Sequence, residues 1–250
     1  MSEEKTALRA LCLAARIILE NGGETYRVEE TVMRMARGLG LSDAGVVAYP
    51  TSLFVTLGTR TVTLRVARRG TDLTRLSVAN DISRHVATGC MDAAQAERAL
   101  LALAESPGPR QALCVVAAGI GAAMFALMFR GGPAAALVAL LSGALTQAAV
   151  PLIARLEMAQ PVTNVLGGFL TALVAYGINF VFPYETPSAA IAGGIMPLLS
   201  GLLMTNAVRD TLYGDLVSGV SRAAEALLIA ATVAIGVFAA LKFWSFFGGL

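Results

Sequence analysis

The sequence predicts a multi-span α-helical integral membrane protein with five transmembrane helices and an N-terminal α+β cytoplasmic domain. First, residues 111–250 contain only ten charged side chains, almost all in short gaps between long apolar runs. Each run approaches or exceeds the roughly 20 apolar residues with which a helix crosses about 30 Å of hydrocarbon. Second, the alternation that a membrane β-barrel needs is absent. Third, 56% of the residues are hydrophobic and only 14% are charged, unlike a typical soluble domain.

Charge divides the chain into two regions. Residues 1–110 contain 14 of the 19 basic and 12 of the 17 acidic residues, the mixture of a water-exposed domain. We therefore predict a domain at 1–105, a linker at 106–110 and a transmembrane domain at 111–250, because the prolines and glycine of the linker cannot continue a helix. The predicted spans are residues 112–129, 134–154, 162–182, 188–208 and 223–247.

The N-terminal domain is expected to begin with two helices. Apolar residues recur at helical spacing from Leu8 to Leu19, and Gly22–Gly23 can end that helix. Thr25 is the expected N-cap of the second helix, whose apolar stripe ends at Leu39, before Gly40.

Three strands and two further helices are expected to complete this domain. The strands are rich in β-branched residues and cover 46–49, 52–57 and 61–67. A tight turn at Gly58–Thr59 joins the last two strands. One helix is marked by apolar spacing from Leu76 to Val86, and the other opens with a capping box of Asp92 and Gln95 and ends near Leu103.

The ends of the chain indicate its orientation. An acidic first segment followed by an amphipathic helix shows no signal peptide, so we expect the N-terminus in the cytoplasm and, after five spans, an external C-terminus at the inner membrane of the cell. The positive-inside bias is modest, with Arg110, Arg155, Arg209 and Arg222 inside and Arg130 and Lys242 outside.

Composition also excludes several functions. The net charge of residues 1–110 is 14 − 12 = +2, which does not suggest a nucleic-acid partner. Cys12, Cys90 and Cys114 are too few and too scattered for a metal site or a disulfide framework. With no phosphate-binding loop either, we expect no metal and no cofactor.

The fourth span contains the sharpest local signal. Gly193–Gly201 places Pro197 and three glycines inside one apolar run, so a continuous helix is not expected. Interrupted helices expose backbone groups to substrate in many transporters, which makes Pro197, Ser200 and Gly201 candidate substrate-binding residues. A simple kink or a small-residue packing interface explains the pattern equally well.

A polar segment follows directly. On a continued helix Asn206 and Asp210 share one face, while Arg209 lies on another, so Arg209 and Asp210 need different partners. An arginine near an interrupted helix suits a substrate carboxylate. A solvated cytoplasmic loop is the alternative. Asn164, inside the third span, is a further candidate for the route, although bonding between helices explains it as well.

Carboxylates also cluster in the N-terminal domain. Glu24, Arg27, Glu29 and Glu30 lie within seven residues, which suits acid–base catalysis or simply a solvated helix start. The enzyme alternative places Glu24, Glu29, Glu30, Asp81 and His85, the only histidine, in one cytoplasmic site.

These motifs together resemble the threonine/serine exporter family, specifically the longer subunit of its split, two-chain form. The resemblance is carried by residues 21–31, 79–84, 193–198, 205–210 and 214–219. It implies an inner-membrane exporter of threonine and serine, or of a dicarboxylate such as succinate, with a smaller membrane subunit as partner. It also implies a cytoplasmic-domain motif, which comprises Glu24, Arg27, Glu29, Asn80, Asp81 and Arg84.

We therefore hypothesise a secondary exporter subunit embedded in the lipid bilayer. Its substrate route is formed by the interrupted span with Asn206, Arg209 and Asp210, and the cytoplasmic domain assembles or gates it. A second membrane subunit or a homo-oligomer is expected, because five spans make a small, asymmetric unit. The alternatives are a membrane-anchored enzyme and a scaffold whose spans pack without a polar cavity.

Overall fold

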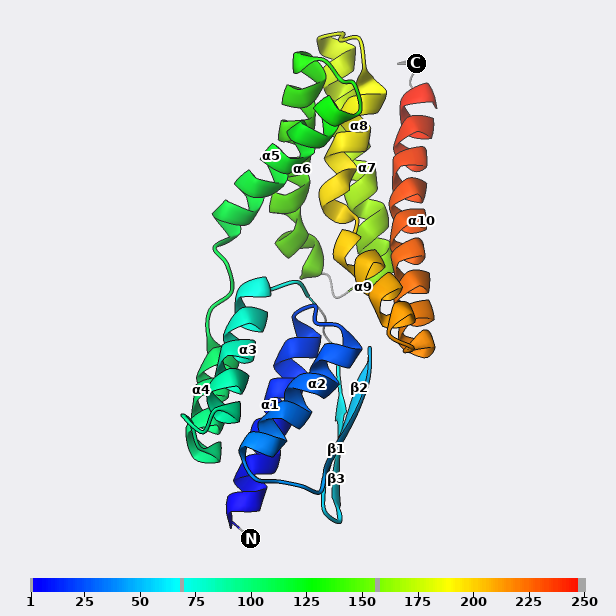
Figure 1. Cartoon of the computed structure of the whole chain (residues 1–250). Helices are drawn as coiled ribbons and strands as arrows, with labels where there is room; N and C mark the ends of the chain where they lie inside the picture. The colour runs from blue at the N-terminus through cyan, green and yellow to red at the C-terminus, as the bar shows by residue number, and fades with distance from the viewer. Residues whose placement is uncertain (1, 68–69, 156–157, 247–250) are drawn as a thin grey trace. The chain divides into compact units, whose positions relative to one another are not determined.

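A computed structural model describes residues 2–67, 70–155 and 158–246 of the chain (Figure 1). Its contacts divide the chain into two compact units. The first contains the residues up to Gly108 together with Leu202–Ala224, and the second contains Pro109–Gly201 together with the residues from Glu225 onward. The segment that follows the predicted interruption of the fourth span therefore packs with the N-terminal residues.

The N-terminal part of the first unit is an α+β fold. Its helices are α1 (Ser2–Glu20), α2 (Thr25–Gly38), α3 (Leu73–Ala87) and α4 (Ala93–Glu105). Its strands are β1 (Ala44–Tyr49), β2 (Ser52–Leu57) and β3 (Arg60–Arg65). They form an antiparallel sheet of order β1-β2-β3, in which Val55 lies opposite Val46 and Val62 (Figure 1). Gly58 has a φ of +57° in the turn between β2 and β3, which confirms the predicted hairpin.

One apolar core joins the helices to the sheet. It is formed by fully buried side chains from α1, α2, β2, α3 and α4, among them Leu11, Ile18, Val32, Met35, Leu53, Val55, Val86 and Leu100. Burial of each large apolar side chain stabilises the fold by about 1.5–3 kcal/mol. The apolar positions that recur at regular spacing in the sequence are therefore the positions that the fold buries.

Two helix starts of this unit test the predicted N-caps. The capping box of α4 is confirmed, since Asp92 Oδ1 accepts from the N–H of Gln95 at 2.7 Å and Gln95 Oε1 accepts from the N–H of Asp92 at 3.0 Å. The prediction for α2 is wrong, because its N-cap is Glu24 and Thr25 is already helical. The Glu24 side chain makes no capping hydrogen bond.

Six further α-helices follow in the described part of the chain. They are α5 (Gln111–Met128), α6 (Pro133–Ala154), α7 (Gln160–Val181), α8 (Pro187–Ile195), α9 (Gly201–Leu212) and α10 (Leu216–Phe246). In the described part of the chain four of them, α5, α6, α7 and α10, are long and apolar enough to cross a membrane, and α8 with α9 adds a fifth if a broken pair counts as one span. Large apolar side chains such as Leu113 and Met128 are about two-thirds exposed, as in helices that face lipid. The chain is thus a multi-pass membrane protein.

The backbone of the fourth predicted span is interrupted, as its proline and glycines indicated. α8 ends at Ile195, and a 3₁₀ turn follows at Met196–Leu198 with Pro197 in its middle. Leu199 is extended, with φ −84° and ψ 129°, before α9 begins at Gly201. The interruption therefore covers the predicted candidates Pro197 and Ser200.

Glycines allow close helix contacts in the second unit. A Cβ on Gly168 of α7 would lie 2.3 Å from the carbonyl oxygen of Val233 in α10, and one on Gly193 of α8 would lie 2.5 Å from that of Ala122 in α5. Such distances leave no room for a side chain, as in small-residue packing between membrane helices. The packing alternative thus accounts for Gly193, while the interruption itself begins three residues later.

Buried hydroxyls of the second unit bond to nearby groups. Thr146 Oγ1 of α6 and Thr171 Oγ1 of α7 lie 2.9 Å apart, and the Thr171 hydroxyl donates to the Gly167 carbonyl at 2.9 Å. Asn164, 9% exposed, accepts from Gln160 Nε2 at 3.3 Å within the same helix. The candidate Asn164 is thus a buried residue of α7 whose side chain bonds to Gln160 of the same helix.

Candidate functional site

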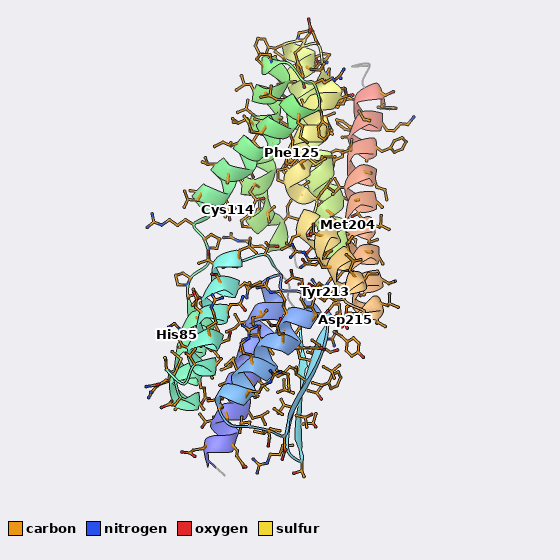
Figure 2. The ribbon with its side chains drawn as sticks, viewed as in Figure 1. His85, Cys114, Phe125, Met204, Tyr213 and Asp215 are labelled. Atoms are coloured by element: carbon orange, nitrogen blue, oxygen red, sulfur yellow. The ribbon has the colours of Figure 1, made fainter. Side chains whose placement is uncertain are left out.

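The candidate site lies in the first unit, where the turn between α1 and α2 meets the end of α9 and the start of α10. We call it the polar cluster and define it by side chains and backbone groups of Gly22, Gly23, Glu24, Thr25, Arg27, Asn206, Arg209, Asp210, Asp215 and Arg222. Its two halves are separated by more than 170 residues of sequence. Figure 2 shows Asp215 and Tyr213 in the turn that follows α9.

Two glycines present their carbonyl groups to this cluster. Asn206 Nδ2 donates to the carbonyl of Gly22 at 2.8 Å, and Arg222 Nη2 donates to that of Gly23 at 2.9 Å. Gly22 has a φ of +95°, a conformation that side chains disfavour. A Cβ on Gly23 would lie 2.4 Å from Ile18 Cγ2 and 2.7 Å from the Ile18 carbonyl oxygen. The turn therefore requires glycine for its shape and for its space.

Asp210 is fully buried and forms the centre of the polar cluster. Its Oδ1 accepts from the backbone N–H of Thr25 at 3.2 Å, and its Oδ2 lies 2.9 Å from Arg222 Nε. The Arg222 side chain is only 5% exposed, so this is a buried ion pair. A carboxylate at a helix N-terminus is also favoured by the helix dipole and by the orphan N–H groups there. Asp210 thus performs, from α9, the capping that the sequence assigned to Thr25.

The Thr25 hydroxyl has a different partner. Its Oγ1 donates to Asp215 Oδ2 at 3.0 Å, so both the backbone and the side chain of Thr25 bind carboxylates from the α9–α10 region. Tyr26 of α2 also stacks on Tyr213, with ring centroids 4.0 Å apart and planes 11° from parallel. The start of α2 is consequently joined to this region by polar and aromatic contacts.

Glu24 holds two arginines at the edge of the polar cluster. Its Oε1 lies 2.6 Å from Arg209 Nη1 and its Oε2 lies 3.3 Å from Arg27 Nη1. Burial alone would raise the pKa of Glu24, but hydrogen bonds at its own backbone and from Arg209, with the charges of both arginines, hold that pKa below its ordinary value. Glu24 is therefore ionised at neutral pH although its side chain is only 4% exposed.

The polar cluster contains equal numbers of positive and negative side chains, but its arginines differ in their exposure to solvent. Three carboxylates, Glu24, Asp210 and Asp215, accompany three arginines, Arg27, Arg209 and Arg222. Arg222 is buried, whereas the Arg209 side chain is 53% exposed. A guanidinium has five N–H donors, more than one carboxylate can use. Arg209 therefore has N–H donors that Glu24 does not use.

The structure brings some of the predicted site residues together. Asn206, Arg209 and Asp210 meet Glu24 and Arg27 in the polar cluster. As predicted, Asn206 and Asp210 share a buried face, and the adjacent Arg209 and Asp210 have different partners. Arg222 lies against Asp210. Pro197, Ser200, Gly201 and Asn164 belong to the second unit.

Other predicted residues of the N-terminal motif have partners of their own. Glu29 Oε1 accepts from the N–H of Ala48 at 2.8 Å. Burial and the nearby charge of Asp215 raise the pKa of Glu29, which the Ala48 hydrogen bond offsets only partly. On α3, Arg84 pairs with Asp81, and the Asn80 carbonyl accepts from Ser83 Oγ at 2.6 Å.

The residues that the enzyme alternative placed in one site have separate partners in the structure. Glu24 binds Arg209, and Glu30 pairs with Arg34 at 2.6 Å. His85 is exposed on α3, with its Nδ1 2.9 Å from the carbonyl oxygen of Asp81 (Figure 2). Among the residues that the structure describes, no group of three His, Cys, Asp or Glu side chains could hold a metal ion.

Sequence reasoning missed how the polar cluster is assembled. Gly22, Gly23 and Asp215 stood within the motifs that it singled out, but nothing in their spacing connects them to Thr25, Asn206 or Arg222. The one available signal was indirect: adjacent opposite charges at Arg209 and Asp210 cannot satisfy each other on a helix and so require partners elsewhere.

Comparison with known proteins supplies a family. The model described as "Putative threonine/serine exporter" matches residues 9–244. A probable threonine/serine exporter of Mycobacterium tuberculosis is 27% identical over 91% of this chain and 44% of its own length. The threonine/serine exporter of Corynebacterium glutamicum is 27% identical over 90% of this chain and 49% of its own.

A second kind of relative has a similar length to this chain. The probable succinate transporter subunit YjjP of Klebsiella aerogenes is 25% identical over 99% of this chain and 97% of its own length. The chain thus spans about half the length of the threonine/serine exporters and nearly all of the succinate transporter subunit. No solved structure matches the chain.

Proposed function

Since the chain belongs to the threonine/serine exporter family, whose members are transporters and not enzymes, we propose that it is a subunit of an inner-membrane secondary exporter of small carboxylate-bearing metabolites. Its cargo is threonine and serine or a dicarboxylate such as succinate, since its relatives are named threonine/serine exporters and a succinate transporter subunit. Both kinds of cargo present a carboxylate, so one arginine site serves either.

The observation that carries this proposal is the half-exposed Arg209, which lies in the second helix of the interrupted pair and is paired with the buried carboxylate of Glu24. The charges of the polar cluster are already balanced. An anionic substrate therefore binds most favourably where it takes the place of a carboxylate beside an arginine. Glu24 is the carboxylate that it would displace from Arg209. The substrate would then weaken one link between α2 and α9, which couples substrate binding to the N-terminal part of the chain.

The proposal includes an arrangement in the membrane. The N-terminus is cytoplasmic, the C-terminus is external, and the interrupted pair with Pro197, Ser200, Gly201 and Asn164 contributes to the route. A relative of matching length is named a subunit, and relatives about twice as long are named exporters. These lengths support a second membrane subunit that supplies what the longer relatives carry in one chain.

The experiment that tests this function is transport in proteoliposomes. Vesicles holding this chain, with and without the product of a candidate partner gene, are loaded with radiolabelled serine, threonine or succinate, and efflux is measured. Arg209→Ala is expected to abolish efflux while the chain still inserts and elutes normally, because the substrate loses its cation. Arg34→Ala, which removes an exposed pair with Glu30 on α2, is the matched control and should leave efflux unchanged.

Either of two results would contradict the proposal. Efflux by the Arg209→Ala variant at the rate of the unmodified chain would remove Arg209 from the substrate route. No efflux of any carboxylate by any combination of subunits, with correctly inserted protein, would remove the transport function itself.

A further inference from the structure

A hollow lies in the N-terminal part of the first unit, and none of the residues that line it belongs to the polar cluster. It has a volume of about 910 Å³ and is lined by α1, α4 and β3 with the preceding turn. Sites for small molecules commonly measure about 300–1,000 Å³ and combine an apolar lining with a few polar groups. We call it the α1–β3 pocket.

The lining of the α1–β3 pocket is apolar at its floor. Leu8, Cys12 and Leu13 contribute one face of α1, while Val62 and Leu64 contribute the inner positions of β3. Leu8 and Cys12 are less than 10% exposed, so these side chains belong to the core at the same time. Burial raises the pKa of the Cys12 thiol to about 11, which is the behaviour of a thiol in apolar surroundings.

The rim of the pocket is basic. It carries Lys5, Arg9, Arg16 and Arg60 against one carboxylate, Glu97, which lies 3.7 Å from Arg9. Arg16 pairs with Glu20 at 2.7 Å. Neither Lys5 nor Arg60 forms an ion pair within the part of the chain that the structure describes. Like charges gathered around one hollow repel each other, and a bound anion relieves that repulsion.

The geometry points to a binding site for an amphipathic carboxylate, with its apolar chain on the α1–β3 floor and its head group between Lys5 and Arg60. An inorganic anion would leave the apolar floor unused, and a neutral apolar molecule would leave Lys5 and Arg60 without a bound counter-charge. A carboxylate with one alkyl chain satisfies both, because arginine forms strong charge-assisted hydrogen bonds with carboxylates. This site is independent of the proposed transport route.

The test measures protection of a reporter thiol in the full-length chain in lipid nanodiscs. Leu101 lines the pocket on α4 and is 42% exposed, so Leu101→Cys places a reactive thiol at its rim. Cys90 is exposed and does not line the pocket, which makes it an internal control in the same molecule. Alkylation by N-ethylmaleimide is followed at both positions by peptide mass spectrometry in the presence of octanoate, acetate or 1-octanol.

Octanoate is expected to protect position 101 saturably and to leave Cys90 unchanged. At about four times its Kd, octanoate leaves about one fifth of the sites open, so alkylation slows about fivefold. Acetate and 1-octanol at equal concentration should protect less than twofold. Lys5→Gln with Arg60→Gln should raise the apparent Kd at least about tenfold, through the loss of charged hydrogen bonds. Arg37→Gln, an exposed arginine of α2 outside the pocket, should not.

Three results would overturn the inference. Equal protection by 1-octanol would show an apolar hollow without recognition of the carboxylate, and no protection by octanoate would show no site. Protection that rises with protein concentration without octanoate would show that a second copy of the chain covers the pocket. Alkylation of Cys90 at its normal rate verifies in each case that the reagent is active, and the buried Cys12 stays unalkylated only while the variant is folded.

Discussion

The substitution Asp210→Asn tests whether the buried ion pair joins α9 and α10 to the start of α2. Asparagine has nearly the shape of aspartate but no charge, so Arg222, only 5% exposed, would lose the carboxylate that lies 2.9 Å from its Nε. Removal of one partner of a buried ion pair costs about 3–5 kcal/mol. A weakened acceptor for the Thr25 N–H adds about 1 kcal/mol at most, and the two effects are not additive because they share one side chain. We therefore expect a loss of about 3–5 kcal/mol in the free energy of unfolding of the first unit.

Two measurements check this magnitude. The free energy of unfolding is obtained by denaturant titration in detergent, and hydrogen exchange at the Thr25 amide reports the local contact. Asp81→Asn is the matched control, because it removes an equivalent charge from an exposed pair with Arg84 and should cost less than about 1 kcal/mol. If Asp210→Asn costs no more than the control and leaves Thr25 exchange unchanged, Asp210 does not hold these segments together.

Three further substitutions test other parts of the structure. Glu29→Gln keeps the acceptor for the Ala48 N–H and removes a carboxyl group whose pKa the fold raises, so the variant should have a higher melting temperature than the native chain at pH 7. The native chain gains stability as the pH falls through this raised pKa, so the difference in melting temperature should shrink in acid. A difference that stays constant or reverses would contradict the prediction. Gly23→Ala should cost about 1–3 kcal/mol through its clash with Ile18, measured by denaturant titration, whereas Gly45→Ala, with its nearest neighbour 3.9 Å away, should be nearly neutral. Gly168→Ala should lower the melting temperature by separating α7 from α10, and Gly121→Ala, which meets nothing within 4 Å, should not; equal effects would refute the close crossing.

The elements that could be predicted are those specified by neighbouring residues. The hairpin at Gly58 and the capping box of Asp92 and Gln95 follow from side chains within a few positions of each other, and both are present in the structure. Pro197 removes a backbone donor, and with the neighbouring glycines it predicted that the fourth span is not one continuous helix. Thr25 shows the limit of such reasoning, because its hydroxyl binds Asp215 from a remote segment instead of capping its own helix.

The sequence by itself determined that this protein crosses a membrane several times. The length of each apolar run can be read directly from the chain, and it matches the number of helical residues that span the hydrocarbon core. It also determined that Arg209 and Asp210 need partners beyond their own helix. Only the tertiary structure decided that those partners are Glu24, Thr25 and Arg222. A buried charge is tolerated only beside a counter-charge or a hydrogen-bond donor. When that group is some 185 residues away, the folded chain alone shows which one it is.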